Sequence, residues 1–165
     1  MIARACISIA ALALVFACAG PPAPELRRSL APPRSAPVAS PSAGADVARA
    51  AESMIGVPYR YGGSSPRGFD CSGLVQYSYA KAGITGLPRT TSALERHARP
   101  ISLAELEPGD LLFFRLSGKK ASHVAIYVGD RAFVHAPSGG KRVEKVAFDH
   151  VYWGPRLGRA GRLGF

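Results

Sequence analysis

Cys71 lies where a thiol can act as a nucleophile. It follows Asp70 and opens residues 71–82, whose apolar residues repeat at helical spacing until Gly83. Because Asp70 is a good N-cap, Cys71 is predicted at the first helical position, where unpaired N–H groups and the positive end of the helix dipole stabilise a thiolate. The alternative is a small buried cysteine that only packs under the helix.

Two histidines, His123 and His135, supply the partners that such a nucleophile needs. They lie on the two strands of a predicted hairpin. A three-residue loop centred on Gly129 would make them direct cross-strand neighbours on one face, with Cβ atoms about 4.5–5.5 Å apart, whereas a two-residue loop would shift the register by one. One imidazole would then take the thiol proton while the other, as a neutral tautomer, accepts a hydrogen bond from the first.

Two other interpretations stay open on these residues alone. Both histidines could be structural members of the sheet, or the cysteine and the two histidines could be ligands of a zinc ion. His97 and His150 have no comparable setting and are predicted to be surface or structural residues. Asp110, which follows Gly109 at the start of a strand, is predicted to fix a turn rather than to do chemistry.

The elements that must hold these residues change in type along the chain. Helical patterns come first: a helix capped by Asp46 and ended by Gly56, the Cys71 helix, and short helices with capping boxes that begin at Ser92 and Ser102. Alternating patterns then predict strands at 111–115, 123–128, 132–136 and 142–147, and a final edge strand at 156–163. This order predicts an α+β fold, with N-terminal helices packed on a central antiparallel β-sheet.

The N-terminus predicts export. Residues 1–17 resemble a secretory signal, because a short positive region with Arg4 precedes an apolar run that is too short to span a bilayer comfortably. The run ends in Leu-Val-Phe-Ala before Cys18, which resembles a bacterial lipobox, so Cys18 is predicted to be lipidated and to become the mature N-terminus. Residues 18–44, rich in proline, alanine and serine, predict an extended tether, and 45–165 the folded domain.

The lipobox also predicts a location. Ala19 follows the cysteine, where an aspartate would indicate retention in the inner membrane. The resemblance therefore implies a lipid anchor in the outer membrane, facing the periplasm. The alternative is simple secretion of a soluble protein after cleavage near Ala17 or Ala19.

The net charge narrows the classes of partner, and the cysteine content bears on disulfides. The 165-residue chain has a formal net charge of +10, which favours anionic partners such as nucleic acid, anionic lipid or an acidic wall polymer. The basic residues are scattered, without a basic helix or an aromatic–basic array, so nucleic acid is not expected. Removal of Cys6 with the signal and modification of Cys18 would leave Cys71 as the one free thiol, without a disulfide framework.

Several blocks of sequence match one family in order. They are Gly56-Val57-Pro58-Tyr59, Gly62-Gly63, Gly68-Phe69-Asp70-Cys71-Ser72-Gly73-Leu74-Val75-Gln76, Pro88-Arg89-Thr90-Thr91, Pro108-Gly109-Asp110-Leu111-Leu112-Phe113-Phe114, Ser122-His123-Val124-Ala125-Ile126-Tyr127-Val128-Gly129 and Phe133-Val134-His135-Ala136. From about Asp46 to Arg159 the chain resembles the NlpC family of papain-like cysteine peptidases, which cut bacterial cell-wall peptides.

The resemblance implies roles for individual residues. Cys71 would be the nucleophile, His123 the base and His135 the orienting third member. Tyr59 would line the site and help to hold the oxyanion or the substrate. The backbone N–H groups of Cys71 and Ser72 suit an oxyanion hole because they are unpaired donors at a helix start.

The resemblance also implies a reaction. The expected function is that of a peptidoglycan hydrolase that cleaves the γ-D-glutamyl–diamino acid bond of stem peptides, without a metal or an organic cofactor. The stem peptide is anionic, so Arg89 or Arg60 is predicted to contact it. The alternatives are an amidase or acyltransferase on the same scaffold, and a non-catalytic lipoprotein that binds wall peptides or proteins. Whether a protein regulator restrains the activity is left open.

Overall fold

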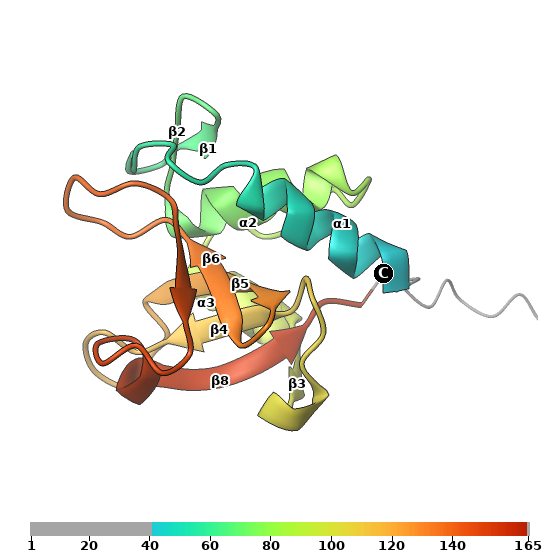
Figure 1. Cartoon of the computed structure of the whole chain (residues 1–165), viewed down its shortest axis with the longest axis vertical. Coiled ribbons are helices and arrows are strands. Elements are labelled where there is room, and N and C mark those ends of the chain that lie inside the picture. Colours follow the sequence, from blue (N-terminus) through green and yellow to red (C-terminus); the bar gives the residue numbers. More distant parts are fainter. Residues whose placement is uncertain (1–40, 165) are drawn as a thin grey trace, which may run out of the picture. The chain divides into compact units, whose positions relative to one another are not determined.

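A computed structural model describes residues 41–164 (Figure 1). The predicted signal, Cys18 and the tether up to residue 40 lie outside the described residues. Within the described part, the helices are too short or too polar to cross a membrane. The elements confirm the predicted α+β class: the principal helices come first, and most of a six-stranded antiparallel sheet follows.

Three α-helices precede most of the sheet. They are α1 Pro41–Glu52, α2 Cys71–Lys81 and α3 Thr91–His97. Helix α1 begins five residues before Asp46, so the prediction that Asp46 caps this helix is wrong. The Asp46 carboxylate instead pairs with the Arg49 guanidinium at 2.7 Å. Residues 41–44, assigned to the tether by composition, form the first turn. A Cβ atom on Gly44 would overlap the Pro108 carbonyl, so a glycine lets α1 approach that turn closely.

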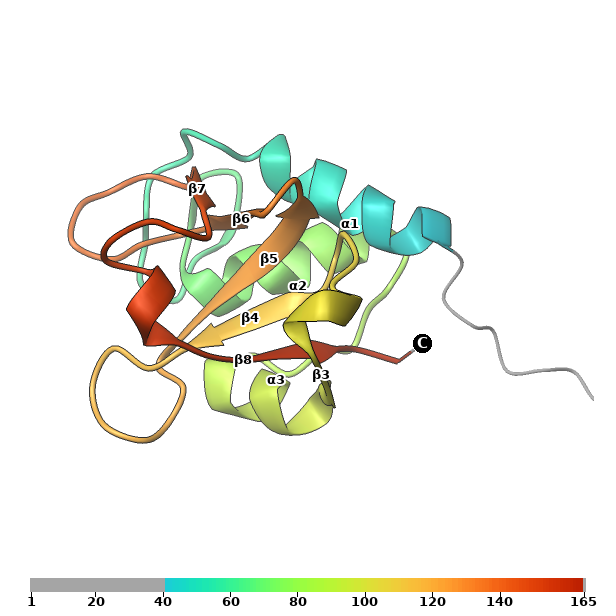
Figure 2. The ribbon, with the colours of Figure 1, turned by 60° about the horizontal axis from the view of Figure 1, so that its bottom comes forward.

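The main sheet has the strand order β3-β8-β4-β5-β6-β7 and is antiparallel throughout (Figures 1 and 2). Its strands are β3 Arg99–Ile101, β4 Leu111–Phe114, β5 His123–Gly129, β6 Ala132–His135, β7 Glu144–Ala147 and β8 Leu157–Arg162. The predicted strands 111–115, 123–128, 132–136 and 142–147 are confirmed within two residues at their ends. A short hairpin, β1 Ser64–Ser65 with β2 Gly68–Phe69, lies before α2. Short 3₁₀ turns cover Leu103–Glu105 and Gly154–Arg156.

Strand β8 was predicted to be an edge strand and that prediction is wrong. It lies between β3 and β4. Its glycines, which weaken the strand pattern, are sites of close packing: a Cβ on Gly161 would come within 2.9 Å of Ala98 Cβ, and one on Gly158 within 2.9 Å of the Arg115 guanidinium. The sequence pattern did not predict β3, the short strand that pairs with β8 at the edge of the sheet.

The sheet is buried on both faces, as β4 demonstrates. Its four residues are all buried and alternate between two apolar clusters. Leu111 and Phe113 belong to the cluster that includes residues of α1 and α2, while Leu112 and Phe114 pack with Phe133 and Trp153. Helices α1 and α2 therefore pack on one face, and residues after β7, Trp153 among them, pack on the other.

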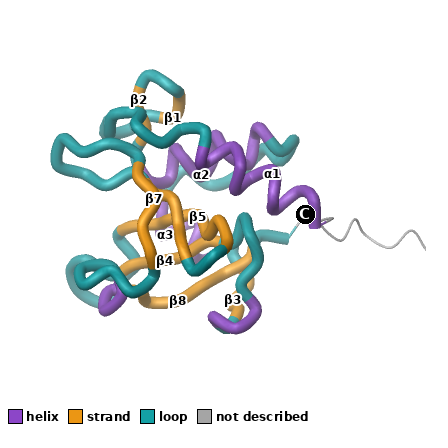
Figure 3. The backbone as a smooth tube through the Cα atoms, in the orientation of Figure 1, coloured by secondary structure: helices purple, strands orange, loops and turns teal. Residues whose placement is uncertain are grey.

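Two connections far apart in the sequence lie side by side at one end of the molecule (Figure 3). The segment between α1 and β1 pairs with the connection between β6 and β7: the Tyr59 N–H donates to the Lys141 carbonyl at 2.8 Å, and Pro58 forms a β-bridge with Arg142. This pairing fixes the loop that carries Tyr59 next to Phe69, with which Tyr59 forms a further bridge.

Candidate active site

Cys71 is the first residue of α2, as predicted. Asp70 has an extended backbone (φ −91°, ψ 175°), and its carboxylate accepts a hydrogen bond from the Gly73 N–H at 2.7 Å. It is therefore the N-cap of the helix. The cap uses the Gly73 donor, and the earlier N–H groups of Cys71 and Ser72 have no intrahelical acceptor.

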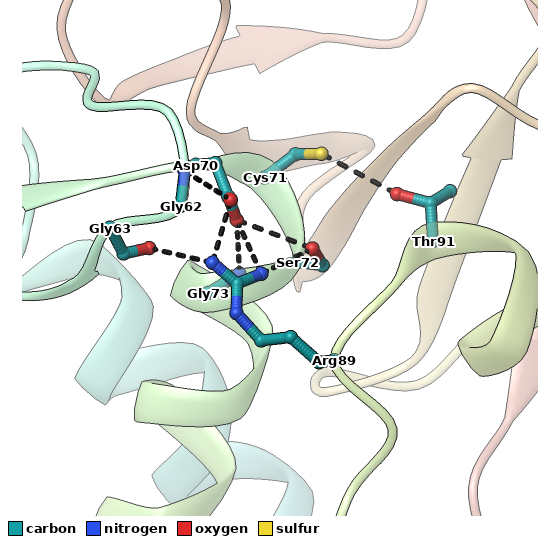
Figure 4. A network of polar contacts seen from close by, with 8 residues as sticks. All are labelled: Gly62, Gly63, Asp70, Cys71, Ser72, Gly73, Arg89 and Thr91. Carbon is teal, nitrogen blue, oxygen red and sulfur yellow. Dashed lines mark hydrogen bonds and ion pairs between the residues drawn. The ribbon is translucent and has the colours of Figure 1, made fainter.

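The Asp70 carboxylate is also the centre of a network of polar contacts, the Asp70 network (Figure 4). Arg89 binds it with both terminal nitrogens, at 2.8 and 2.7 Å, and the Gly62 N–H donates to it at 2.9 Å. The guanidinium of Arg89 also donates to the Ser72 hydroxyl at 2.8 Å and to the Gly63 carbonyl at 3.4 Å. The network thus ties the glycine-rich turn, the helix start and the segment before α3 together.

The Asp70 network keeps its charges paired. Burial alone would raise the pKa of Asp70, but the hydrogen bonds from Arg89 and Gly73 outweigh it and lower the pKa. The ion pair offsets the negative charge that Asp70 would otherwise place beside the sulfur. Arg89 and Arg60 were both predicted to contact the substrate. The Arg89 guanidinium instead binds the Asp70 carboxylate, whereas Arg60 is exposed.

The sulfur of Cys71 has its polar contact with Thr91. The Sγ atom lies 3.5 Å from Thr91 Oγ1, at the first residue of α3 (Figure 4). Cys71 is partly buried and packs against the apolar cluster that includes Val124 and Ala136, which are the chain neighbours of His123 and His135.

The two histidines are hydrogen-bonded to each other. His123 Nε2 lies 2.8 Å from His135 Nδ1, and the side chains are 5% and 0% exposed. The spacing of the two residues allowed such a histidine pair in the register of a three-residue loop, and the pair forms in a different register. The observed register pairs Ile126 with Val134, so His135 and His123 are diagonal rather than direct neighbours on one face.

The turn of the hairpin explains the correction. It has two residues, Asp130 and Arg131, both with positive φ (50° and 51°), so of the two loop lengths considered the shorter one forms, and not the three-residue loop around Gly129. A bulge between Tyr127 and Gly129 then shifts the register by one residue. The combined displacement from the predicted register is even, so both histidines stay on the same face of the sheet.

Aromatic rings enclose the histidine pair. Trp153 stacks on His123, with ring centroids 5.0 Å apart and planes at 29°, and meets His135 edge-on at 4.5 Å and 80°. The ring centroid of Phe114 lies 6.0 Å from that of His123, and the ring centroid of Phe133 lies 5.4 Å from that of His135. Trp153 is itself buried. Its position against both rings was not predicted, since it lies in an irregular segment.

The dry surroundings keep both imidazoles neutral at pH 7. Burial lowers the pKa of His123 to about 4. Burial, followed by the electrostatic effect of His123, Lys141 and His150, lowers the pKa of His135 as well. A neutral pair shares one proton between Nε2 and Nδ1, and when His123 donates it, the Nδ1 atom of His123 is free to accept a proton.

The comparison with protein families decides the classification. The NlpC/P60 family model matches residues 56–162. This chain belongs to the NlpC/P60 family. The match contains the Asp70 network, Cys71 and the histidine pair, and it confirms the resemblance that the sequence blocks indicated.

Known NlpC/P60 proteins are similar over the same part of the chain. Murein DD-endopeptidase MepH of Escherichia coli (strain K12) is 47% identical over 104 residues, 61% of this chain and 38% of MepH. The bifunctional muramidase/DL-endopeptidase CwlT of Bacillus subtilis (strain 168) is 44% identical over 111 residues, 66% of this chain and 33% of CwlT. A solved Staphylococcus aureus subsp. aureus Mu50 structure, described as similar to lipoprotein, NLP/P60 family, superposes with a TM-score of 0.65 and 35% identity, covering 75% of this chain and 42% of that chain. This chain spans less than half the length of each of the three.

Tyr59 lies in the loop before β1 and packs, like Cys71, against the apolar cluster that includes residues of α1 and α2. Burial, Cys71 and Asp70 raise the pKa of Tyr59, so its hydroxyl remains a hydrogen-bond donor at neutral pH. Of the Ser72 groups, the side chain is engaged by Asp70 and Arg89, which leaves its backbone N–H as the donor that could serve a reaction.

The other residues that the sequence singled out are structural or exposed. The Asp110 carboxylate accepts from the Glu107 N–H at 2.8 Å and pairs with Arg162 at 2.7 Å, which confirms its predicted role in a turn. His97 and His150 are exposed, also as predicted. Over residues 41–164, the His, Cys, Asp and Glu side chains do not form a three-residue cluster that could hold a metal ion.

Proposed function

We propose that this protein is a peptidoglycan hydrolase, a cysteine endopeptidase that cleaves stem peptides with Cys71 as its nucleophile. The observation that carries the proposal is the 2.8 Å bond between two neutral, buried imidazoles in the domain whose helix α2 starts at Cys71. A structural pair of histidines would need neither the helix-start thiol nor the ionic network beside it. The names of MepH and CwlT, both endopeptidases, support the same reaction class.

The proposed first step forms a thioester. His123 accepts the thiol proton on Nδ1 while its Nε2–H stays bonded to His135. The thiolate of Cys71 attacks the peptide carbonyl, and the electron pair of the C=O bond moves onto oxygen. The N–H groups of Cys71 and Ser72 and the Tyr59 hydroxyl donate to that oxyanion; one such donor is commonly worth about 10²–10³ in kcat. The C–N bond then breaks, and the amine leaves with the proton from His123.

The second step restores the enzyme. His123 takes a proton from water, the resulting hydroxide attacks the thioester carbonyl, and the carboxylic acid leaves as the thiolate is reprotonated. Proton transfer in the first step requires a hydrogen bond between Cys71 Sγ and His123 Nδ1, whereas the polar contact that the sulfur makes here is to Thr91 Oγ1 at 3.5 Å. Catalytic hydrogen bonds commonly tighten in this way only in the substrate complex.

The proposed scissile bond joins γ-D-glutamate to the diamino acid. The relatives differ here, because MepH is named a DD-endopeptidase and CwlT a DL-endopeptidase. Purified monomeric and cross-linked muropeptides should be incubated with the full mature chain, with Cys71→Ala and with His97→Gln as an exposed control, and the products identified by mass. We expect a fragment that ends in D-glutamate from the wild type and from His97→Gln, and none from Cys71→Ala.

Other products would select the alternatives. Cleavage of the D-alanyl cross-link alone would replace the proposed bond by the DD bond, and a sugar freed of its peptide would indicate an amidase. Binding without cleavage by a folded wild-type protein would contradict the enzyme proposal and favour a wall-binding lipoprotein.

We further propose that Cys18 carries a lipid anchor in the outer membrane, on the periplasmic side. The lipobox-like residues before Cys18 support this, as does the description of the Staphylococcus aureus relative as similar to lipoprotein. Metabolic labelling with a clickable fatty acid should label the wild type and not Cys18→Ser, and fractionation should move the variant out of the membrane. Equal labelling of both proteins would contradict the anchor. A protein regulator stays a prediction that cross-linking in the envelope would test.

A further inference from the structure

Glu144 faces the outer end of the histidine pair. In the register between β6 and β7 it is the direct cross-strand partner of His135. Its Oε1 atom lies 3.2 Å from His135 Nε2, the ring nitrogen that does not bind His123. The Glu144 side chain is 44% exposed, whereas that of His135 is fully buried. The carboxylate therefore reaches from the solvent side of an edge strand to a ring that water does not reach.

The Nε2 atom of His135 needs this neighbour. It is buried and has no well-aligned hydrogen bond within residues 41–164, although the Glu144 oxygen is within hydrogen-bond distance. An unpaired buried N–H is costly, and the half-exposed Glu144 side chain can turn to align with it. The geometry thus provides one acceptor for one buried donor.

The choice of tautomer links this contact to His123. A neutral imidazole carries one proton, so a ring that donates from Nε2 must accept at Nδ1. His135 Nδ1 is the atom bonded to His123 Nε2. When His135 donates to Glu144, His123 must therefore donate from Nε2, and its Nδ1 keeps the lone pair that a base requires.

We propose that Glu144 is a positioning residue that accepts the Nε2–H of His135 and so fixes the tautomers of both histidines. This inference rests on the proposed function, in which His123 is the base. The contact acts by selecting a tautomer rather than as an ion pair, because burial of the ring, followed by the electrostatic effect of His123, Lys141 and His150, disfavours a charged His135.

The decisive readout is the tautomer of His135 in the folded protein, which needs no substrate. Two-bond ¹H–¹⁵N spectra of the ¹⁵N-histidine-labelled chain distinguish protonated from unprotonated ring nitrogens, and His→Gln variants at His97 and His150 help to assign them. We expect protonated Nε2 and unprotonated Nδ1 for His135 in the wild type. Glu144→Ala should mix the tautomers, and Glu144→Gln should keep the wild-type pattern, because the amide oxygen can still accept.

Kinetics supply the second readout. The kcat of Glu144→Ala on muropeptides should fall by about 3- to 10-fold with little change in KM, and Glu144→Gln should recover most of the loss. Glu52→Gln is the matched control: Glu52 is a carboxylate of similar exposure that pairs with Lys145, the next residue of β7, and its replacement should leave kcat unchanged.

The outcomes separate this inference from the proposed function. A wild-type tautomer pattern and kcat in Glu144→Ala would overturn the positioning role and leave the peptidase proposal standing. An equal loss in Glu144→Gln and Glu144→Ala would also overturn it, because charge rather than an acceptor would then matter. Inactivity of the wild type on every muropeptide would contradict the proposed function, while the spectra would still report whether Glu144 sets the tautomer.

Discussion

The Asp70 network and the histidine pair have opposite electrostatic character, because the first is charged and the second neutral. The network is partly exposed and ionic: the Arg89 and Asp70 side chains are 38% and 13% exposed and bind each other with two hydrogen bonds. The histidine pair is dry, with Trp153 against both rings, and burial holds it neutral.

The difference suits what the proposed function requires of each group. A sulfur that becomes an anion gains from a helix start whose adjacent carboxylate is neutralised by an arginine. A base must be unprotonated before the reaction, and burial among aromatic rings ensures this at neutral pH. Replacements should therefore act differently in the two regions.

The largest effect is expected from the histidine pair. His135→Leu removes the acceptor of His123 Nε2–H and should lower kcat by roughly 10²–10⁴. It should also lower the free energy of unfolding by about 1–3 kcal/mol, because a buried donor loses its partner. Replacing both histidines by leucine should leave the protein inactive but restore most of that stability. Muropeptide cleavage and urea unfolding test this. If the variant with both histidines replaced is less stable than His135→Leu, the apolar character of the surroundings of the histidine pair is contradicted.

As the pH falls, protonation of the histidine pair should destabilise the fold before protonation of Asp70 does. The pKa of His123 is about 4 in the folded protein and about 6.5 when unfolded, so the unfolded state binds the extra proton between these values. The contribution of His123 to stability should be fully present above pH 6.5 and fall by about 3 kcal/mol on the way to pH 4, in addition to a fall from His135, whose pKa is also lowered. Urea unfolding across this range measures the slope, which should flatten in His123→Leu. An unchanged slope in that variant would assign the acid sensitivity elsewhere.

Arg89→Met tests the ionic region. Loss of its charge-assisted hydrogen bonds should lower the free energy of unfolding by about 1.5–3 kcal/mol at pH 7. The lowered pKa of Asp70 means that this contribution is present above about pH 4 and is lost as the pH falls through the folded value. The difference from wild type should therefore shrink in acid. Arg60→Met, an exposed arginine of the adjoining loop, is the control and should change stability little.

Thr91→Val should have the smallest effect. The contact between Cys71 Sγ and Thr91 Oγ1 is 3.5 Å long, and thiols are weak hydrogen-bonding groups. The rate of alkylation of Cys71 by iodoacetamide should change by less than about 3-fold, with Ser92→Ala as the control in the same helix turn. A change above 10-fold would give Thr91 a larger part in holding the sulfur than this geometry indicates.

The sequence was sufficient for the local features of the site. Asp70 as a cap and Cys71 as the first helical residue follow from short-range preferences. The same preferences gave wrong caps at Asp46 and Ser92, because α1 already begins at Pro41 and α3 is capped by Thr90. The strands with alternating or fully apolar patterns could be predicted because these patterns are also local. The fold class and the family blocks were predicted because many such local preferences agree with one another.

The long-range features required the tertiary structure. The bulge in the β5–β6 hairpin, the place of β8 inside the sheet and the contact of Trp153 with both histidines depend on which surfaces pack together. Arg89 could be assigned to the substrate on charge alone, because nothing local shows that it binds Asp70, 19 residues earlier. Sequence was sufficient to place Cys71 at a helix start and to single out His123 and His135, and the family resemblance gave these residues the roles proposed for them. Packing decided their partners, their register and the protonation of the histidines, because burial and the nearness of distant segments exist only in the folded chain.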